Sequence, residues 1–512
     1  MKRVLAWSVA CLLGAGAVFL GPTLFGKPWS IDHFFVRSLV QSLGDHPMLL
    51  SYARPLDTWG LDFYSDDLDD YSLGASRATL DQMEEILVGL QAYDRTSLRP
   101  DQQLSYDILE WLLEAQLAGR PFLLHSYPLN QFDGAQSGLP DFMVNIHKVA
   151  DVDDARNYLA RVAKFEKALE ELRASVQERA ARGLLPPRFV LEAVRAESAA
   201  FAAGRPEENI LYTNLDESLG GMAGLGAEER EAMLAELSAT IEESVQPAYD
   251  RLSETLAELA RRASEDAGAW KHPEGEAYYR WALRWHTTTD KTPDEIHRIG
   301  LIEVERIHGE MRKILEAEGL PSDDPIATLH ELGEDPRFLY PDSDEGRAQI
   351  LEDYRRILTE ASERLPELFG RLPEAEVAVE RVPVFREAGA AGAYYNPPSL
   401  DGTRPGIFYA NLRDVSEVHR FGMRTLAFHE ALPGHHLQIA LTMENGTLPL
   451  FRRFIPMTAF IEGWALYSER LALEHGFHTT PYDELGALSA EVFRAARLVV
   501  DTGIHAKGWS RE

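Results

Sequence analysis

The chain has 512 residues, of which 45% are hydrophobic and 26% charged, a composition typical of a globular protein long enough for two or more structural units. Its formal net charge is −31 at pH 7. An excess of carboxylates argues against nucleic acid as a partner, because phosphates need Lys and Arg contacts, and against peripheral docking on anionic lipid.

The N-terminus has the pattern of an export signal. A basic pair precedes an uncharged run from Val4 to Gly26, and this run is also long enough to cross a bilayer. We therefore expect residues 1–27 to be a signal peptide or an N-terminal membrane anchor, with the body periplasmic or facing outward from the cell membrane. Cys11, the single cysteine, follows too short an apolar run for a good lipoprotein signal. The body then has no thiol for a disulfide, a nucleophile or a metal site.

Apolar residues recur at three- and four-residue steps from about residue 76 onward, which predicts a mainly α-helical body. The first clear helix follows Ser76 as its N-cap. Thr292 and Glu295 form a capping box that starts another helix, with Pro at its first position. The expected long helices are 76–90, 151–181, 228–263, 292–319, 457–476 and 484–507.

A short β region is expected late in the chain. Val377–Val382 is rich in Val, and the proline after it indicates an edge strand or a strand end. Gly392–Tyr395 and Gly406–Ala410 flank a turn-rich stretch. We expect a small sheet here, an N-terminal helical region over 28–290, and a second helical region over 291–512 that contains the sheet.

The residue types of a zinc hydrolase site follow this sheet. His429-Glu430-Ala431-Leu432-Pro433-Gly434-His435-His436 is followed by Glu462 in Glu-Gly-Trp-Ala. Catalytic zinc needs neutral imidazoles and a carboxylate as ligands, an open position for water, and a carboxylate off the metal to take the proton. The candidate ligands are His429, one of the two later histidines, and Glu462, with Glu430 as the candidate base.

The spacing of the histidines requires a break in the helix. His435 and His436 lie six and seven residues after His429. On an unbroken helix, six residues turn a side chain about 120° off the face, and seven place it roughly 10 Å along the axis. Pro433-Gly434 can supply the distortion, because Pro interrupts the hydrogen-bond ladder and Gly permits a bulge. We prefer His435 as the ligand, with His436 behind it.

Other residues are weaker candidates. Glu469 shares a helical face with Glu462 and could orient a ligand imidazole, although a surface position is the better expectation. Tyr394 and Tyr395 could line a strand edge that pairs with a peptide substrate, or could be core aromatics. Arg497, Asp501 and His505 are spaced by four, and they could bind a substrate carboxylate or an oxyanion, or form an ion-pair ladder. His505 is the nearest candidate for a donor to the oxyanion.

Several motifs resemble the bacterial "domain of unknown function 885" family. They are His-Glu-Ala-Leu-Pro-Gly-His-His-Leu-Gln (429–438), Glu-Gly-Trp-Ala-Leu-Tyr-Ser-Glu (462–469), Asp-Thr-Gly-Ile-His-Ala-Lys-Gly-Trp-Ser (501–510), Gly-Ala-Tyr-Tyr-Asn-Pro-Pro-Ser (392–399) and Thr-Pro-Asp-Glu-Ile-His (292–297). The family looks like a distant relative of the helical zinc oligopeptidases and carboxypeptidases, which implies a largely α fold around a deep cleft. The resemblance implies zinc held by His429, His435 and Glu462, with Glu430 as base. Members usually continue beyond the Trp-Ser motif, so this chain is expected to be shortened.

The expected function is hydrolysis of peptide bonds in small peptides by a zinc metallopeptidase of the cell envelope. The alternative is a catalytically inactive peptide-binding protein, or an inactive fragment, on the same scaffold. The expected partner is a peptide, with no nucleic acid, and with membrane contact through the N-terminal segment alone. The sequence does not indicate an oligomeric state.

Overall fold

The structure is a computed structural model that describes residues 26–54, 62–384, 386–455 and 457–511. The expected signal or anchor over 1–27 therefore lies outside the described residues, apart from its last two positions. Within the described ranges, no helix combines the length and the apolar character needed to cross a bilayer.

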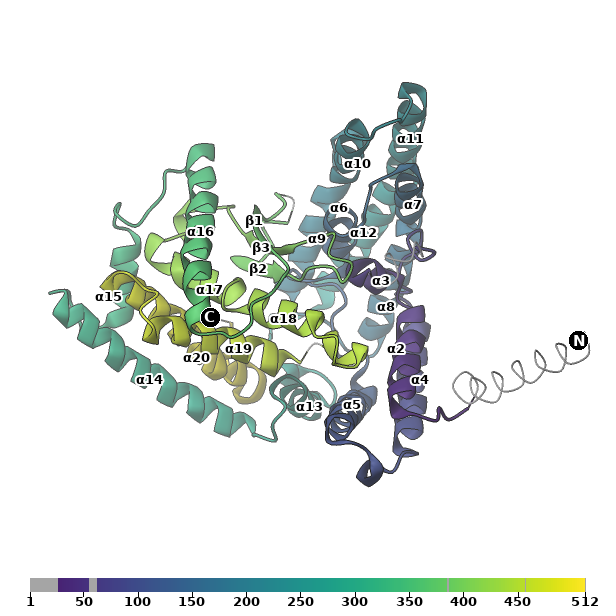
Figure 1. Ribbon diagram of the computed structural model, residues 1–512. Helices are drawn as coiled ribbons and strands as arrows, with labels where there is room; N and C mark the ends of the chain where they lie inside the picture. The colour runs from purple at the N-terminus through teal and green to yellow at the C-terminus, as the bar shows by residue number, and fades with distance from the viewer. Residues whose placement is uncertain (1–25, 55–61, 385, 456, 512) are drawn as a thin grey trace, which may run out of the picture.

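The protein is mainly α, as expected, with one small mixed sheet. Helices from the first half stand on one side of the molecule, and the later helices and the sheet lie on the other (Figure 1). The first group is α2 (Ile31–Gly44), α3 (Pro47–Ala53), α4 (Leu73–Gln91), α5 (Pro100–Ala118), α6 (Ala135–Asn145), α7 (Val152–Ala163), α8 (Phe165–Ala181), α9 (Arg188–Ala202), α10 (Ile210–Gly220), α11 (Ala227–Thr240) and α12 (Gln246–Arg262). The second is α13 (Gly275–Thr287), α14 (Pro293–Ala317), α15 (Pro325–Gly333), α16 (Asp344–Arg364), α17 (Met423–Glu430), α18 (His435–Glu444), α19 (Thr458–Glu474) and α20 (Pro481–Lys507).

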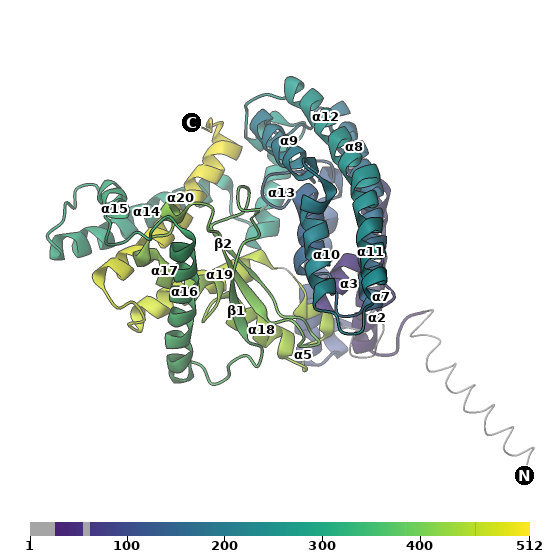
Figure 2. The ribbon, with the colours of Figure 1, turned by 90° about the horizontal axis from the view of Figure 1, so that it is seen from above.

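The helix boundaries follow local chemistry. The capping box that starts α14 is present, with Thr292 and Glu295 bonded reciprocally. The expected Ser76 cap is wrong by four residues: the Ser72 hydroxyl accepts the Ala75 N–H, and the Ser76 hydroxyl donates to the carbonyl of Ser72. The expected helix over 151–181 is interrupted at Lys164, so it forms α7 and α8. The helix over 228–263 contains a π turn that joins α11 and α12 end to end. Seen from above, α8 and α9 lie beside α12 (Figure 2).

The three strands are β1 (Val377–Arg381), β2 (Ala393–Asn396) and β3 (Gly406–Ala410), in the order β1-β3-β2. β1 runs parallel to β3, and β2 runs antiparallel to it. All five residues of β3 are buried because it is central, whereas β1 is an edge strand, as the following proline predicts. Phe408 of β3 packs edge-on against Tyr354 of α16, with ring centroids 4.9 Å apart. The sheet thus shares its core with α16 and α17.

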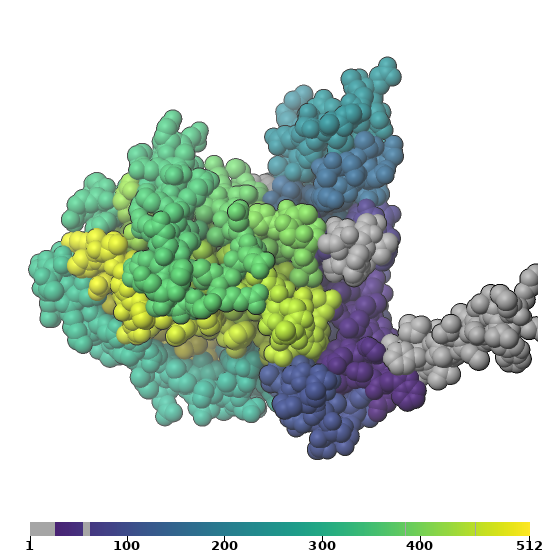
Figure 3. Space-filling view, viewed as in Figure 1, coloured from purple at the N-terminus to yellow at the C-terminus, as the bar shows by residue number. Residues whose placement is uncertain are grey.

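The two halves of the chain meet through aromatic packing. Phe451, in the short helix η10 (Leu450–Arg453), packs on Phe35 of α2 with centroids 5.0 Å apart. Burial of a ring of this size stabilises a contact by about 1.5–3 kcal/mol. In the space-filling view the yellow-green surface of the second half adjoins the purple and blue surface of the first half (Figure 3).

Candidate metal centre

The helix break expected at Pro433-Gly434 is present. α17 ends at Glu430, and α18 begins at His435. Only glycine fits at position 434, because a Cβ there would lie 1.9 Å from the backbone oxygen of His429. The break is held from α19: the Trp464 indole N–H and the Ser468 hydroxyl both donate to the Pro433 carbonyl, at 2.9 and 3.1 Å. The residues after Glu462 thereby fix the loop that sets the spacing of the histidines.

This break brings donor atoms from three helices together. His429 Nε2 lies 3.6 Å from Glu462 Oε2, and His435 Nε2 lies 3.7 Å from Glu462 Oε1. One donor atom from each of the three residues can be chosen so that all lie within 4.8 Å of one another. Zinc–ligand bonds of 2.0–2.2 Å in tetrahedral geometry separate two ligand atoms by about 3.3–3.6 Å. The three side chains could therefore hold a metal ion.

Glu469 orients the first of these imidazoles. Its Oε1 accepts a hydrogen bond from His429 Nδ1 at 2.7 Å, which leaves Nε2 to face the other donors. Arg494 of α20 lies 2.8 Å from His429 Nδ1 and 2.9 Å from the same carboxylate oxygen. It donates to the carboxylate, because a protonated Nδ1 cannot also accept from a guanidinium. The expected surface position for Glu469 is wrong: the residue is 3% exposed. Its seven-residue spacing from Glu462 was the sequence signal, since both lie on the α19 face toward α17.

His436 lies outside the donor group. Its Nε2 donates to the Ala375 carbonyl at 3.0 Å, so its Nδ1 accepts from the Tyr395 hydroxyl at 2.8 Å. The Tyr395 ring lies over that of His435, with centroids 6.5 Å apart. Tyr394 points elsewhere, packing on Tyr409 at 5.0 Å. Of the two tyrosines, Tyr395 is therefore the one beside the donor group.

Burial and neighbouring charges together set the pKa values of Glu430 and the three donor residues. Desolvation raises the pKa of Glu430 to about 7. For His429, burial lowers the pKa, but the carboxylates of Glu462 and Glu469 outweigh it and raise the pKa to about 9. Burial lowers the pKa of His435 to about 4, so this imidazole is neutral and can offer a lone pair. The His429 contact lowers the pKa of the Glu462 carboxyl.

A cavity of about 530 Å³ opens onto this group. His429, Glu430 and Glu462 line it, together with Arg497. Within the described part of the chain, no carboxylate lies within ion-pair distance of the Arg497 guanidinium, which stands over the Phe493 ring at 5.9 Å. The cavity thus presents an available positive charge beside the donor atoms.

His505 is not brought into this cavity. Its Nδ1 accepts the Ala269 backbone N–H at 3.0 Å, and its ring stacks on Tyr279 with centroids 5.1 Å apart. Tyr279 in turn donates to Asp501 at 2.5 Å. Neither His505 nor Asp501 is one of the described residues that line the cavity. The four-residue spacing did predict a shared face, but this face contacts α13 and the loop before it.

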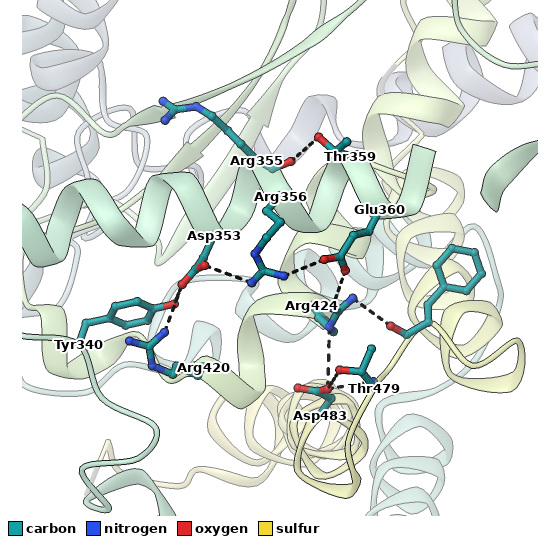
Figure 4. Close-up of polar contacts among 11 residues, drawn as sticks. Tyr340, Asp353, Arg355, Arg356, Thr359, Glu360, Arg420, Arg424, Thr479 and Asp483 are labelled. Atoms are coloured by element: carbon teal, nitrogen blue, oxygen red, sulfur yellow. Dashed lines mark hydrogen bonds and ion pairs between the residues drawn. The ribbon is translucent and has the colours of Figure 1, made fainter. Parts of the chain in front are cut away.

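Charged side chains lock α17 between its neighbours (Figure 4). Arg424, five residues before the first histidine, donates to Glu360 of α16 at 2.6 Å and lies 3.9 Å from Asp483 of α20. Arg420 pairs with Asp353 of α16 at 3.2 Å. These contacts fix the start of α17 on both sides and so help to position His429 at its other end.

Comparison with known proteins places the chain in a family. A family model described as "Bacterial protein of unknown function (DUF885)" matches residues 56–512. The chain belongs to this family. Among solved structures, this DUF885 chain is similar to "the putative lipoprotein from Colwellia psychrerythraea", with 30% identity and a TM-score of 0.86 over 94% of this chain and 84% of that one. A structure described as "a putative lipoprotein of unknown function from Shewanella oneidensis" shares the fold, with 17% identity and a TM-score of 0.64 over the same shares of the two chains.

No curated protein matches this DUF885 chain. The family description gives no activity.

Proposed function

We propose that the protein is a zinc-dependent metallopeptidase that hydrolyses peptide bonds in small peptides. The observation that carries this proposal is the convergence of His429, His435 and Glu462 into one donor group, next to a cavity that Glu430 also lines. Two imidazoles and one carboxylate are the ligand set of many catalytic zinc sites. When bound, zinc supplies a Lewis acid that polarises a carbonyl and acidifies water.

Glu430 is the proposed general base. It lines the cavity and is 7% exposed, and its carboxylate is not part of the donor group. In this position it accepts a proton from the attacking water and passes it to the leaving amine. The backbone of α17 sets its place next to His429, so the base and the first metal-binding side chain are aligned by the same turn of helix.

Arg497 is the proposed contact for a carboxylate of the peptide, since its guanidinium lines the cavity and has no carboxylate partner in the described ranges. Tyr395 contributes to substrate binding by the ring that it lays beside His435. His505 and Tyr394 are not assigned roles in the reaction, because their contacts lie with Tyr279 and Tyr409.

The proposed location is the cell envelope, with residues 1–27 as signal or anchor. Support comes from the basic, apolar N-terminal pattern and from the description of the similar Colwellia psychrerythraea structure as a "putative lipoprotein". Cell fractionation tests this: recovery of the native protein in the cytosol alone would contradict it.

The test of the mechanism is Glu430→Gln. We expect it to keep one zinc per chain and the wild-type fold, but to lose peptide hydrolysis by at least about 10². Glu417→Gln is a matched control, because Glu417 lines the same cavity but is paired with Arg413 away from the donor group. Near-wild-type turnover by Glu430→Gln would remove the mechanism. If the zinc-loaded wild type binds peptides and hydrolyses none, the protein is the inactive peptide-binding form.

A further inference from the structure

A second cavity lies where the two halves of the chain meet. It has a volume of about 620 Å³, which is in the range of small-ligand sites. Its walls come from α3, α5 and α18, and from residues 448–455 and 457–461, which include η10 and the start of α19. Most of the lining is apolar, including Leu49, Ile108, Ile439, Met443, Phe454 and Phe460. Phe460 is 58% exposed, so this apolar lining reaches the surface.

The apolar cavity begins beside two of the three donor residues. Gln438, in its wall, lies one helical turn after His435 on α18. Ile461, which also lines the cavity, immediately precedes Glu462 on α19. The apolar cavity shares no lining residue with the polar cavity that contains Glu430. The donor group therefore has one cavity of each kind next to it.

Gln438 carries an unused hydrogen-bond acceptor. The residue is 8% exposed, and its Oε1 is buried without a partner in the described structure. Buried polar atoms nearly always have a partner, and one without it is costly. Since Gln438 lines the apolar cavity, a half-turn of its terminal amide directs this oxygen into the cavity, where a ligand can supply the missing N–H.

The charges in the wall restrict this ligand further. Arg452 and Arg453 line the cavity, and neither has a carboxylate partner among the residues that the structure describes. Arg453 Nε is buried without a hydrogen bond. Two such guanidinium groups repel a cationic side chain, whereas aliphatic and aromatic side chains suit the remaining walls.

We propose that this cavity binds a bulky apolar side chain of the substrate, at a position next to the bond that is cleaved, with Gln438 Oε1 accepting the main-chain N–H of that residue. The inference rests on the proposed peptidase function and adds a substrate class to it. Peptides with Phe or Leu at this position are preferred, and those with Lys or Arg are excluded.

The first test compares kcat/KM for peptides that carry Phe, Ala or Lys at each position around the cleaved bond. At one position, the wild type prefers Phe over Ala by at least about tenfold, as expected for a hydrophobic pocket. Ile439→Trp fills the cavity from a half-buried position and lowers this ratio by at least about tenfold. Ala196→Trp, which fills a separate cavity on α9, is the control and leaves the ratio unchanged. Hydrolysis with a ratio that Ile439→Trp does not alter overturns the inference and leaves the peptidase function standing.

The second test needs no catalysis. N-phenyl-1-naphthylamine, an apolar fluorescent probe, is titrated into metal-free Glu430→Gln protein with and without Ile439→Trp. We expect the Ile439→Trp change to weaken probe binding at least about tenfold, and Phe-containing peptides to displace the probe better than Lys-containing ones. Equal probe binding by the two proteins would overturn the inference. If the probe binds as expected but the zinc-loaded wild type cleaves no peptide, the peptidase function fails and the apolar site stands.

Gln438→Leu separates binding from structure. Because its Oε1 has no partner in the protein, this variant is expected to unfold at the wild-type temperature or above, yet to raise KM for the Phe peptide by at least about tenfold. A lower unfolding temperature with unchanged KM would show a purely structural role and contradict the assignment of Gln438.

Discussion

Replacement of Glu469 by Gln tests how the donor group is held. Glu469 is not one of the three residues that could hold the metal. It acts through His429, whose Nδ1–H donates to the Glu469 carboxylate at 2.7 Å. The change keeps the shape of the side chain and one acceptor oxygen. It removes the negative charge, which orients the His429 imidazole and makes that imidazole more basic. Mutation of a group that hydrogen-bonds to a metal-binding histidine lowers metal affinity by about 10–100-fold, which corresponds to about 1.4–2.7 kcal/mol.

The assay is a zinc titration of Glu469→Gln against a competing chelator, with metal-free unfolding measured in parallel. We expect the Kd for zinc to rise by about 10–100-fold. Arg494 loses its carboxylate partner in this variant, but its side chain is 27% exposed, so water compensates in part. Glu474→Gln is the control on the same helix, because its pair with Arg470 is largely exposed and is worth at most about 1 kcal/mol. A Kd equal to that of the wild type would refute the role of Glu469.

The remaining predictions concern the second histidine, the helix break and the response to acid. His435→Ala is expected to lose zinc binding in a metal-content measurement, whereas His436→Ala keeps it; the reverse result would show that the wrong histidine was chosen. Gly434→Ala places a methyl group 1.9 Å from a backbone oxygen, so we expect a loss of at least about 2 kcal/mol in denaturant unfolding and weaker zinc binding. Burial, with the Arg161 charge, lowers the pKa of His147 to about 3 from 6.5. The unfolded chain therefore takes up the proton first, and the stability present above pH 6.5 falls by about 1.4 kcal/mol per pH unit below it. The free energy of unfolding of His147→Asn should therefore fall less between pH 7 and pH 5 than that of the wild type. An equal fall in the two proteins would contradict the role of His147.

Much of the fold follows from local patterns in the chain. The α14 capping box and the Val-rich edge strand β1 are encoded within a few residues, and both form where the sequence predicts them. Ser76 misled because two serines four residues apart can each cap a helix. The choice of Ser72 depends on which turn packs against the rest of the protein, and spacing alone does not reveal this.

The sequence predicts which residues make up the candidate site, but not all of the contacts that hold them in place. Pro433-Gly434 signalled the interruption, since no other reading lets His429 meet a histidine six residues later. The burial of Glu469 and its contact with Arg494 depend on how α17, α19 and α20 pack together. His505 shows the converse, because its helical face was correct but the element opposite that face was not encoded nearby.

α20 has a mechanical consequence. Its 27 residues form a rod of about 40 Å. Arg494 and Arg497 stand on it at the polar cavity, and Asp501 and His505 tie the same rod to Tyr279 of α13 and to Ala269. A helix is stiff along its axis, so the far end cannot shift while the two guanidinium groups stay in place. α20 therefore couples the position of α13 to that of the two guanidinium groups that line the polar cavity.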